Sequence, residues 1–129
     1  PGMKYKHYSP KARVVIVDGS KNAACRFYDF ALNMGKNPVI VWKEEELYYF
    51  KERNVRSLYK NNDTLIAAKN LFKLLRQTDK EGFDTVFITS VPVNNAGLSV
   101  MNRLLRAAAF TVLDENADES TLKTVLQIN

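Results

Sequence analysis

The sequence predicts an α/β fold with three layers and a mainly parallel sheet of about four to five strands. Short, continuous apolar runs such as VVIV and VIVW are typical of strands that are covered on both faces. Longer segments with apolar residues at helical spacing follow most of these runs. Turn residues separate the two kinds of segment, and right-handed crossovers then make successive strands parallel. The predicted architecture is therefore Rossmann-like.

The first half of the chain begins with a strand, a turn and a helix. RVVIVD (13–18) is the strand, and Gly19 and Ser20 then supply the bend and the helix N-cap. The helix carries one apolar face and ends at Gly35. NPVIVW (37–42) is a second strand, and EEELYYFKER (44–53) predicts a short helix that is acidic at its start and basic at its end.

The second half continues the alternation. VRSLYK (55–60) predicts an edge strand, and Asp63 caps the longest helix. The apolar face of that helix is Leu65, Ala68, Leu71, Phe72 and Leu75, and its other face is Lys69, Lys73, Arg76 and Lys80. DTVFIT (84–89) is the fourth strand and GLSVMNRLLRAAA (97–109) the helix after it. Residues 120–128 are either a last helix or a frayed tail.

Composition and charge limit the function. The chain of 129 residues is 46% hydrophobic, which suits one domain with a core, and its apolar runs are far shorter than the roughly 20 residues of a membrane span. The single cysteine, Cys25, predicts a reducing, cytoplasmic location without a metal site. Of the net charge of +5, +4 lies in the first thirteen residues. The remaining 116 residues are nearly balanced in charge, so we do not expect them to bind the phosphate backbone of a nucleic acid.

No catalytic motif occurs in the chain. GxGxxG, GxxxxGK[ST], GxSxG and HExxH are all absent, and the one histidine, His7, lies near the start. Ligands of open α/β sheets bind beyond the carboxyl ends of strands. The candidate anion or nucleotide crevice is therefore Asp18, Gly19, Ser20, Thr89 and Ser90. Two interpretations stay open: an anion binds at the helix N-terminus, or these residues only form the turn and the cap.

Three segments resemble a known family. PGMKYKHYSP (1–10) is similar to the interdomain linker of the long, two-domain form of threonylcarbamoyl-AMP synthase. AAKNLFKLLRQTDKEGFD (67–84) and GLSVMNRLLRAA (97–108) resemble parts of the C-terminal domain of the same family. The family's helix usually starts Gly-Leu-Gly, whereas the third residue here is Ser99. The resemblance implies a linker at 1–12 and an accessory α/β domain at 13–129.

The resemblance also implies an activity for the parent protein. The family makes threonylcarbamoyl-AMP, as a nucleotidyltransferase, from ATP, threonine and bicarbonate for the modification of adenosine 37 in tRNA. Its YrdC-like catalytic domain would precede Pro1, so we expect the chain to be a fragment that is inactive alone. ATP and Mg would bind that other domain, and no cofactor or metal is expected here.

The linker is the segment to which the resemblance assigns a role. The resemblance implies that the linker is a lid over the catalytic cleft. The lid residues are Gly2, Met3, Lys4, Tyr5, Lys6, His7 and Tyr8. The alternative is a simple tether. The expected partner is the YrdC-like domain of the same protein. Two other functions stay open: an independent nucleotide-binding or hydrolysing module, and a docking surface for tRNA or for the downstream transferase complex.

Overall fold

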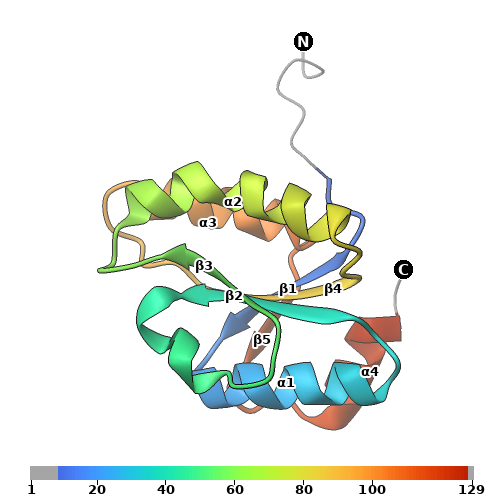
Figure 1. Ribbon diagram of the computed structural model, residues 1–129. Coiled ribbons are helices and arrows are strands. Elements are labelled where there is room, and N and C mark those ends of the chain that lie inside the picture. The colour runs from blue at the N-terminus through green and yellow to red at the C-terminus, as the bar shows by residue number, and fades with distance from the viewer. Residues whose placement is uncertain (1–8, 128–129) are drawn as a thin grey trace.

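The computed structural model, which describes residues 9–127, contains a sheet of five parallel strands (Figure 1). The strands are β1 (Arg13–Asp18), β2 (Pro38–Lys43), β3 (Val55–Tyr59), β4 (Thr85–Thr89) and β5 (Val112–Asp114). Their order is β3-β2-β4-β1-β5, and every pairing is parallel. The predicted three-layer α/β fold is confirmed. The order differs from the Rossmann order 3-2-1-4-5 only by the exchange of β1 and β4.

Helices cover both faces of the sheet (Figure 1). On one face lie α1 (Lys21–Asn33), α4 (Glu119–Gln127) and the 3₁₀ helix η2 (Glu44–Tyr49). On the other face lie α2 (Thr64–Lys80) and α3 (Gly97–Ala107). Each face has its own hydrophobic core, and alternate residues of each central strand point into one or the other. In β4, Val86 and Ile88 pack toward α2 and α3, while Phe87 meets Phe27 of α1 at 6.1 Å between ring centroids.

The predicted helix boundaries are confirmed at the caps. The hydroxyl of Ser20 accepts a hydrogen bond from the N–H of Ala23, and the carboxylate of Asp63 accepts from two N–H groups of the first turn of α2. Gly35 and Gly82 have φ of +85° and +88°, the left-handed conformation that ends α1 and α2. Of the two alternatives for the tail, the helix is found, because α4 spans Glu119–Gln127.

Two predictions were wrong in detail, and one strand was not located by the sequence. Leu65 is 68% exposed, and the buried face of α2 is formed by Thr64, Ala67, Leu71, Leu75 and Thr78, so Leu65 lies outside the face that packs on the sheet. The helix predicted for residues 44–53 is a shorter 3₁₀ helix. The fifth strand, β5, has only three residues, too few for an alternating pattern to indicate it. Among the described residues, no helix is both long and apolar enough to cross a membrane.

Gly97 is the glycine on which the α2–α3 layer most depends. It is buried at the start of α3, and a Cβ atom placed on it would lie 1.6 Å from the carbonyl oxygen of Pro92. The backbone before α3 can approach the helix only because this side chain is missing. Ser99, the third residue of the same helix, is exposed and has no comparable contact.

We expect Gly97→Ala to destabilise the domain. The added methyl group must displace the Pro92 backbone, and overpacking of this kind costs about 1–3 kcal/mol in the free energy of unfolding. Urea denaturation followed by the fluorescence of the single tryptophan, Trp42, measures the loss. Ser99→Ala is the matched control and should change the stability by less than about 0.5 kcal/mol. Equal stability of the two variants would contradict the prediction.

Candidate functional sites at the two ends of the sheet

The structure brings the residues of the predicted crevice together. Val17 of β1 and Thr89 of β4 are in register, and the N–H of Ser90 donates to the carbonyl of Val17 at 3.4 Å. Beyond this pair β1 continues into α1 on one face, while β4 leads to α3 on the other. Neighbouring strands that diverge in this way form the switch point at which α/β proteins bind ligands. The predicted geometry is present, and ligand binding there stays a prediction.

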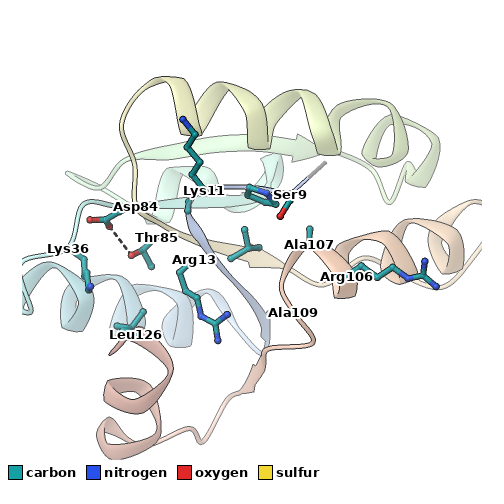
Figure 2. Close-up of a pocket in the computed structure, with 13 residues that line it drawn as sticks. Ser9, Lys11, Arg13, Lys36, Asp84, Thr85, Arg106, Ala107, Ala109 and Leu126 are labelled. Carbon is teal, nitrogen blue, oxygen red and sulfur yellow. Dashed lines mark hydrogen bonds between the residues drawn. The ribbon is translucent and has the colours of Figure 1, made fainter. Parts of the chain in front are cut away.

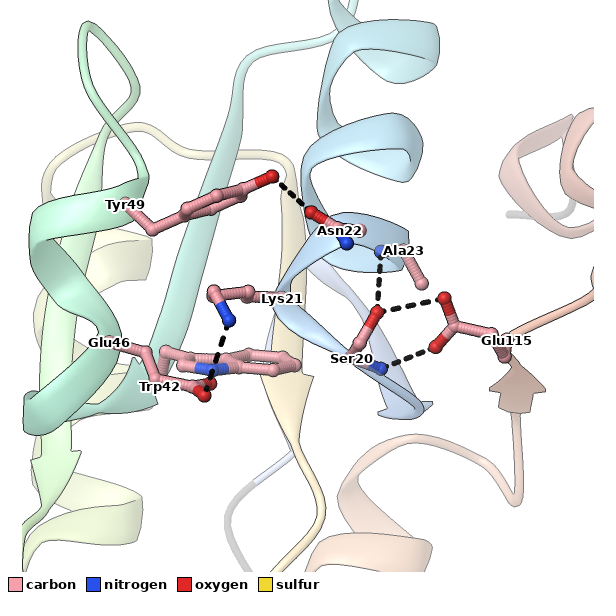
Figure 3. Close-up of polar contacts among 8 residues, drawn as sticks. All are labelled: Ser20, Lys21, Asn22, Ala23, Trp42, Glu46, Tyr49 and Glu115. Carbon is pink, nitrogen blue, oxygen red and sulfur yellow. Dashed lines mark hydrogen bonds and ion pairs between the residues drawn. The ribbon is translucent and has the colours of Figure 1, made fainter.

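A carboxylate of the chain itself occupies the N-terminus of α1 (Figure 3). Glu115, which follows β5, accepts a hydrogen bond from the N–H of Ser20 at 2.5 Å and another from its hydroxyl at 2.8 Å. Gly19 permits this approach, because a Cβ atom there would lie 2.8 Å from Oε1 of Glu115. The position that we predicted for an external anion is therefore held by an internal one. An incoming anion would have to displace it.

The electrostatics at this edge also disfavour a phosphate. Donation by the N–H and then by the hydroxyl of Ser20 holds the pKa of Glu115 below its usual value, so the side chain is an anion at neutral pH. Asp18 of β1 lies in register with Asp114 of β5 at the same end of the sheet. Three carboxylates thus gather where a nucleotide would place its phosphates, and like charges repel.

The first turn of α1 is tied to η2 as well (Figure 3). The buried Trp42 donates from its indole nitrogen to Glu46 at 2.7 Å, and Glu46 pairs with Lys21 at 3.8 Å. The Lys21 ammonium also lies 5.1 Å from the centre of the Tyr49 ring, and the Tyr49 hydroxyl donates to the side chain of Asn22. These side chains hold the helix in place and do not form an open binding surface.

The accessible part of the crevice is an apolar groove on the α3 side. Its volume is about 510 Å³, and Asp18 and Ser90 lie at its edge. The apolar lining is Val91, Val93, Leu98, Met101, Leu105 and Val112. Thr89 does not face a ligand freely, because it is buried and its hydroxyl donates to the carbonyl of Ser90. The groove suits an apolar or planar group much better than an anion.

The other end of the sheet is where the predicted linker joins the domain. The residues predicted as a lid (Gly2, Met3, Lys4, Tyr5, Lys6, His7 and Tyr8) lie outside the described residues. Immediately after them, the N–H groups of Lys11 and Ala12 donate to the two carboxylate oxygens of Asp79, at 3.0 and 3.1 Å. Ala12 is already buried, and β1 starts at Arg13. Asp79 thus fixes the point at which the chain enters the domain.

Beside this junction lies a basic hollow that the sequence alone did not predict (Figure 2). It encloses about 470 Å³, and its charged lining is Lys11, Arg13, Lys36 and Arg106 with one acid, Asp84. The guanidinium of Arg13 is held by the carbonyl of Val125 and the hydroxyl of Thr111. The cations come from segments far apart in sequence, so no local motif indicates the hollow.

Comparison with known proteins gives a consistent result. The family model described as the C-terminal domain of threonylcarbamoyl-AMP synthase matches residues 1–109. The threonylcarbamoyl-AMP synthase of Pyrococcus abyssi is 31% identical over 122 residues, and that of Bacillus subtilis is 30% identical over 113 residues. Each match covers 88% of this chain and 33% of the relative, so the chain spans about a third of the length of these relatives.

Solved structures of related proteins share the fold. P. abyssi Sua5 complexed with L-threonine matches with a TM-score of 0.73 and 29% identity, over 88% of this chain and 33% of that one. The C-terminal Sua5 domain from Pyrococcus horikoshii matches with a TM-score of 0.63 and 27% identity, over 82% of this chain and 99% of that one. The match to an isolated C-terminal domain indicates which part of the larger protein this chain resembles.

We expect the contribution of Glu115 to stability to depend on pH. Because its pKa is lowered in the folded protein, the ionised side chain stabilises the fold above the ordinary pKa of about 4.3, and this stabilisation is lost as the pH falls through the lower, folded value. Glu115→Gln should therefore lower the Tm at pH 7 and approach the wild-type Tm below about pH 4. Thermal melting across this range measures the difference.

The control variant is Glu52→Gln, since Glu52 is an exposed acid outside this contact. Its Tm should differ little from that of the wild type at any pH. A Tm difference for Glu115→Gln that is constant over the whole range would show that its charge is not what holds the N-terminus of α1.

Proposed function

Because this chain belongs to the family of threonylcarbamoyl-AMP synthase C-terminal domains, we propose that it is the accessory and active-site-gating region of such an enzyme. In this proposal the parent protein forms threonylcarbamoyl-AMP from ATP, threonine and bicarbonate in the cytoplasm, for the modification of adenosine 37 in tRNA. A YrdC-like domain binds ATP and Mg and supplies the catalytic residues. The domain that we describe contributes none of them.

The observation that best supports gating is the Asp79 contact. A lid can close reproducibly only if its base is fixed, and Asp79 holds two consecutive backbone N–H groups through both carboxylate oxygens. The next residue, Arg13, begins β1, and its backbone N–H donates to the carbonyl of Asp84 at 2.9 Å. The segment before Ser9 therefore starts from a rigid support, as a lid requires and a loose tether does not.

The composition of residues 2–8 suits a lid over an adenylate. Lys4 and Lys6 can pair with phosphate or carboxylate, and Gly2 permits a sharp bend. Tyr5 and His7 offer rings that cover a ligand and polar atoms that bond to it. A closed lid would exclude water from an intermediate that water hydrolyses.

An independent nucleotide-binding function has less support. Its crevice would use the N-terminus of α1, which Glu115 already occupies, and the remaining groove is apolar. The same edge carries Asp18 and Asp114, which oppose the approach of phosphates. We therefore place the ligand-handling role of this chain at its linker.

We expect Tyr5→Ala/His7→Ala to lower synthesis in a threonylcarbamoyl-AMP synthase that contains this chain. The loss of ring area and polar atoms should admit water and loosen the adenylate, at a cost of roughly 2–3 kcal/mol of transition-state stabilisation, or about 30- to 150-fold in rate. Pyrophosphate release measures turnover. Lys4→Ala is the companion variant and should raise KM more than it lowers kcat if its role is charge pairing. If turnover falls only in proportion to a lower Tm, the gating role is wrong and the linker only connects the two domains.

We expect Asp79→Asn to act through the linker. One of the two backbone N–H groups would then face an amide N–H₂, so the base of the lid should loosen and kcat/KM should fall about tenfold. Glu52→Gln changes an exposed acid away from the linker junction and is the control, which should leave kcat/KM unchanged.

A double-mutant cycle separates this effect from simple destabilisation. Added to Tyr5→Ala/His7→Ala, Asp79→Asn should lower kcat/KM little further, because both changes disable the same lid. Fully additive losses would contradict a shared role.

A further inference from the structure

The near-neutral charge of the domain conceals a separation of charge between its two helical layers. Helices α2 and α3 together carry six cations, Lys69, Lys73, Arg76, Lys80, Arg103 and Arg106, and one acid, Asp79, for a net +5. The helices on the opposite face, α1, η2 and α4, carry three cations and five acids, for a net −2. One face of the molecule is therefore basic and the other is acidic.

The cations of α2 form a continuous row. Lys69, Lys73, Arg76 and Lys80 recur at intervals of four, three and four residues, so they share one side of the helix, opposite its buried side chains. All four are exposed, and at 1.5 Å per residue the row is about 16 Å long. Arg103 and Arg106 are exposed on α3, which lies beside α2 (Figure 1). We call these six residues the basic face.

Most of these charges are not neutralised within the domain. Among the described residues, the side chains of Lys69, Lys73, Lys80 and Arg103 make no ion pair or hydrogen bond. The nearest acid in sequence, Asp79, accepts from the backbone of the linker junction. A solvated helix usually places acids four residues from its lysines, whereas Lys69 and Lys73 repel each other at that spacing. Repulsion between these like charges destabilises the isolated domain, and a negatively charged partner would relieve it.

The basic surface continues beyond the two helices. Lys11, at the linker junction, lines a pocket with Arg76, Lys80 and the acid Asp79, and it also lines the basic hollow with Lys36 and Arg106. Figure 2 shows that Lys11 lies just before β1 and Arg106 on α3, with side chains that point in different directions. A long anion that lies along α2 would therefore meet further cations at the amino end of the sheet.

We propose that the basic face is a docking surface for the phosphate backbone of a nucleic acid. The row presents four cations over about 16 Å, the length in which one strand of a duplex places about five phosphates along the duplex axis, at about 3.4 Å of axial rise for each. Gln77 and Asn102 are exposed on the same helices and offer neutral donors of the kind that contact phosphates and sugars. The aromatic residue of α2, Phe72, packs against the core, and α3 has none, so neither helix offers a ring to enter a bilayer, which favours a nucleic acid over a lipid surface. The proposal does not depend on the proposed gating function.

The test is binding of a short labelled RNA hairpin by the full chain, measured by fluorescence anisotropy between about 50 and 200 mM salt. Four phosphate contacts predict a slope of roughly −3 to −4 in log K against log salt concentration. A DNA duplex of the same sequence should bind with a similar slope, because backbone contacts carry no base sequence. Absence of salt-dependent binding would overturn the proposal. Equal binding to phosphatidylserine vesicles or to polyglutamate would do so too.

Matched variants locate the surface. Lys69→Gln/Lys73→Gln should lower the affinity for the hairpin roughly 10- to 60-fold and reduce the slope by about 1.5 to 2. Lys51→Gln/Lys123→Gln removes the same charge from exposed positions outside α2 and α3, and should change the affinity by less than about threefold. Equal losses in both variants would indicate a response to net charge alone.

The basic linker must be tested separately. In a protein that already carries Lys4→Gln/Lys6→Gln, the further change Lys69→Gln/Lys73→Gln should still cause most of its loss of affinity for the hairpin. If binding disappears with the linker lysines and is insensitive to those of α2, the docking surface is the linker and the proposal is wrong. Glutamine is a good helix former, so circular dichroism should confirm that α2 is intact in every variant.

Discussion

The insertion of β4 between β1 and β2 is the constraint on which this domain depends. Each of those strands pairs with β4 over four or five residues, and they do not pair with each other. All five residues of β4 are buried, so helices must cover both of its faces. The crossovers consequently diverge at β4, which produces two separate cores and a crevice between β1 and β4.

This architecture places different chemistry at the two ends of the sheet. At the carboxyl end Glu115 binds at the crevice that such folds commonly use, and an apolar groove lies open beside it. At the amino end cations gather around the linker junction and extend over α2 and α3. A fold-level rule therefore identifies where a site can form, whereas the side chains decide whether it is used.

The sequence was sufficient for most of the fold and for little of the site. Continuous apolar runs located β1, β2 and β4, and the caps at Ser20 and Asp63 located two helices, because these signals are local. Glu115 and Asp79 could not be predicted, since each acts on a segment roughly 70 or more positions away along the chain. The balanced charge of the body was misleading for a similar reason. The net charge is summed over the whole sequence, whereas a partner contacts the charges on one face of the folded domain.

The same strand order has a consequence for synthesis on the ribosome. Strand β2 can pair with β3 soon after both emerge, but the first strand has no neighbour until residues 85–89 are available, about 70 positions later. Until then its apolar run stays unpaired, and contacts between such distant segments slow folding. The nascent domain therefore cannot acquire its central sheet gradually from the amino terminus. It must wait for its fourth strand.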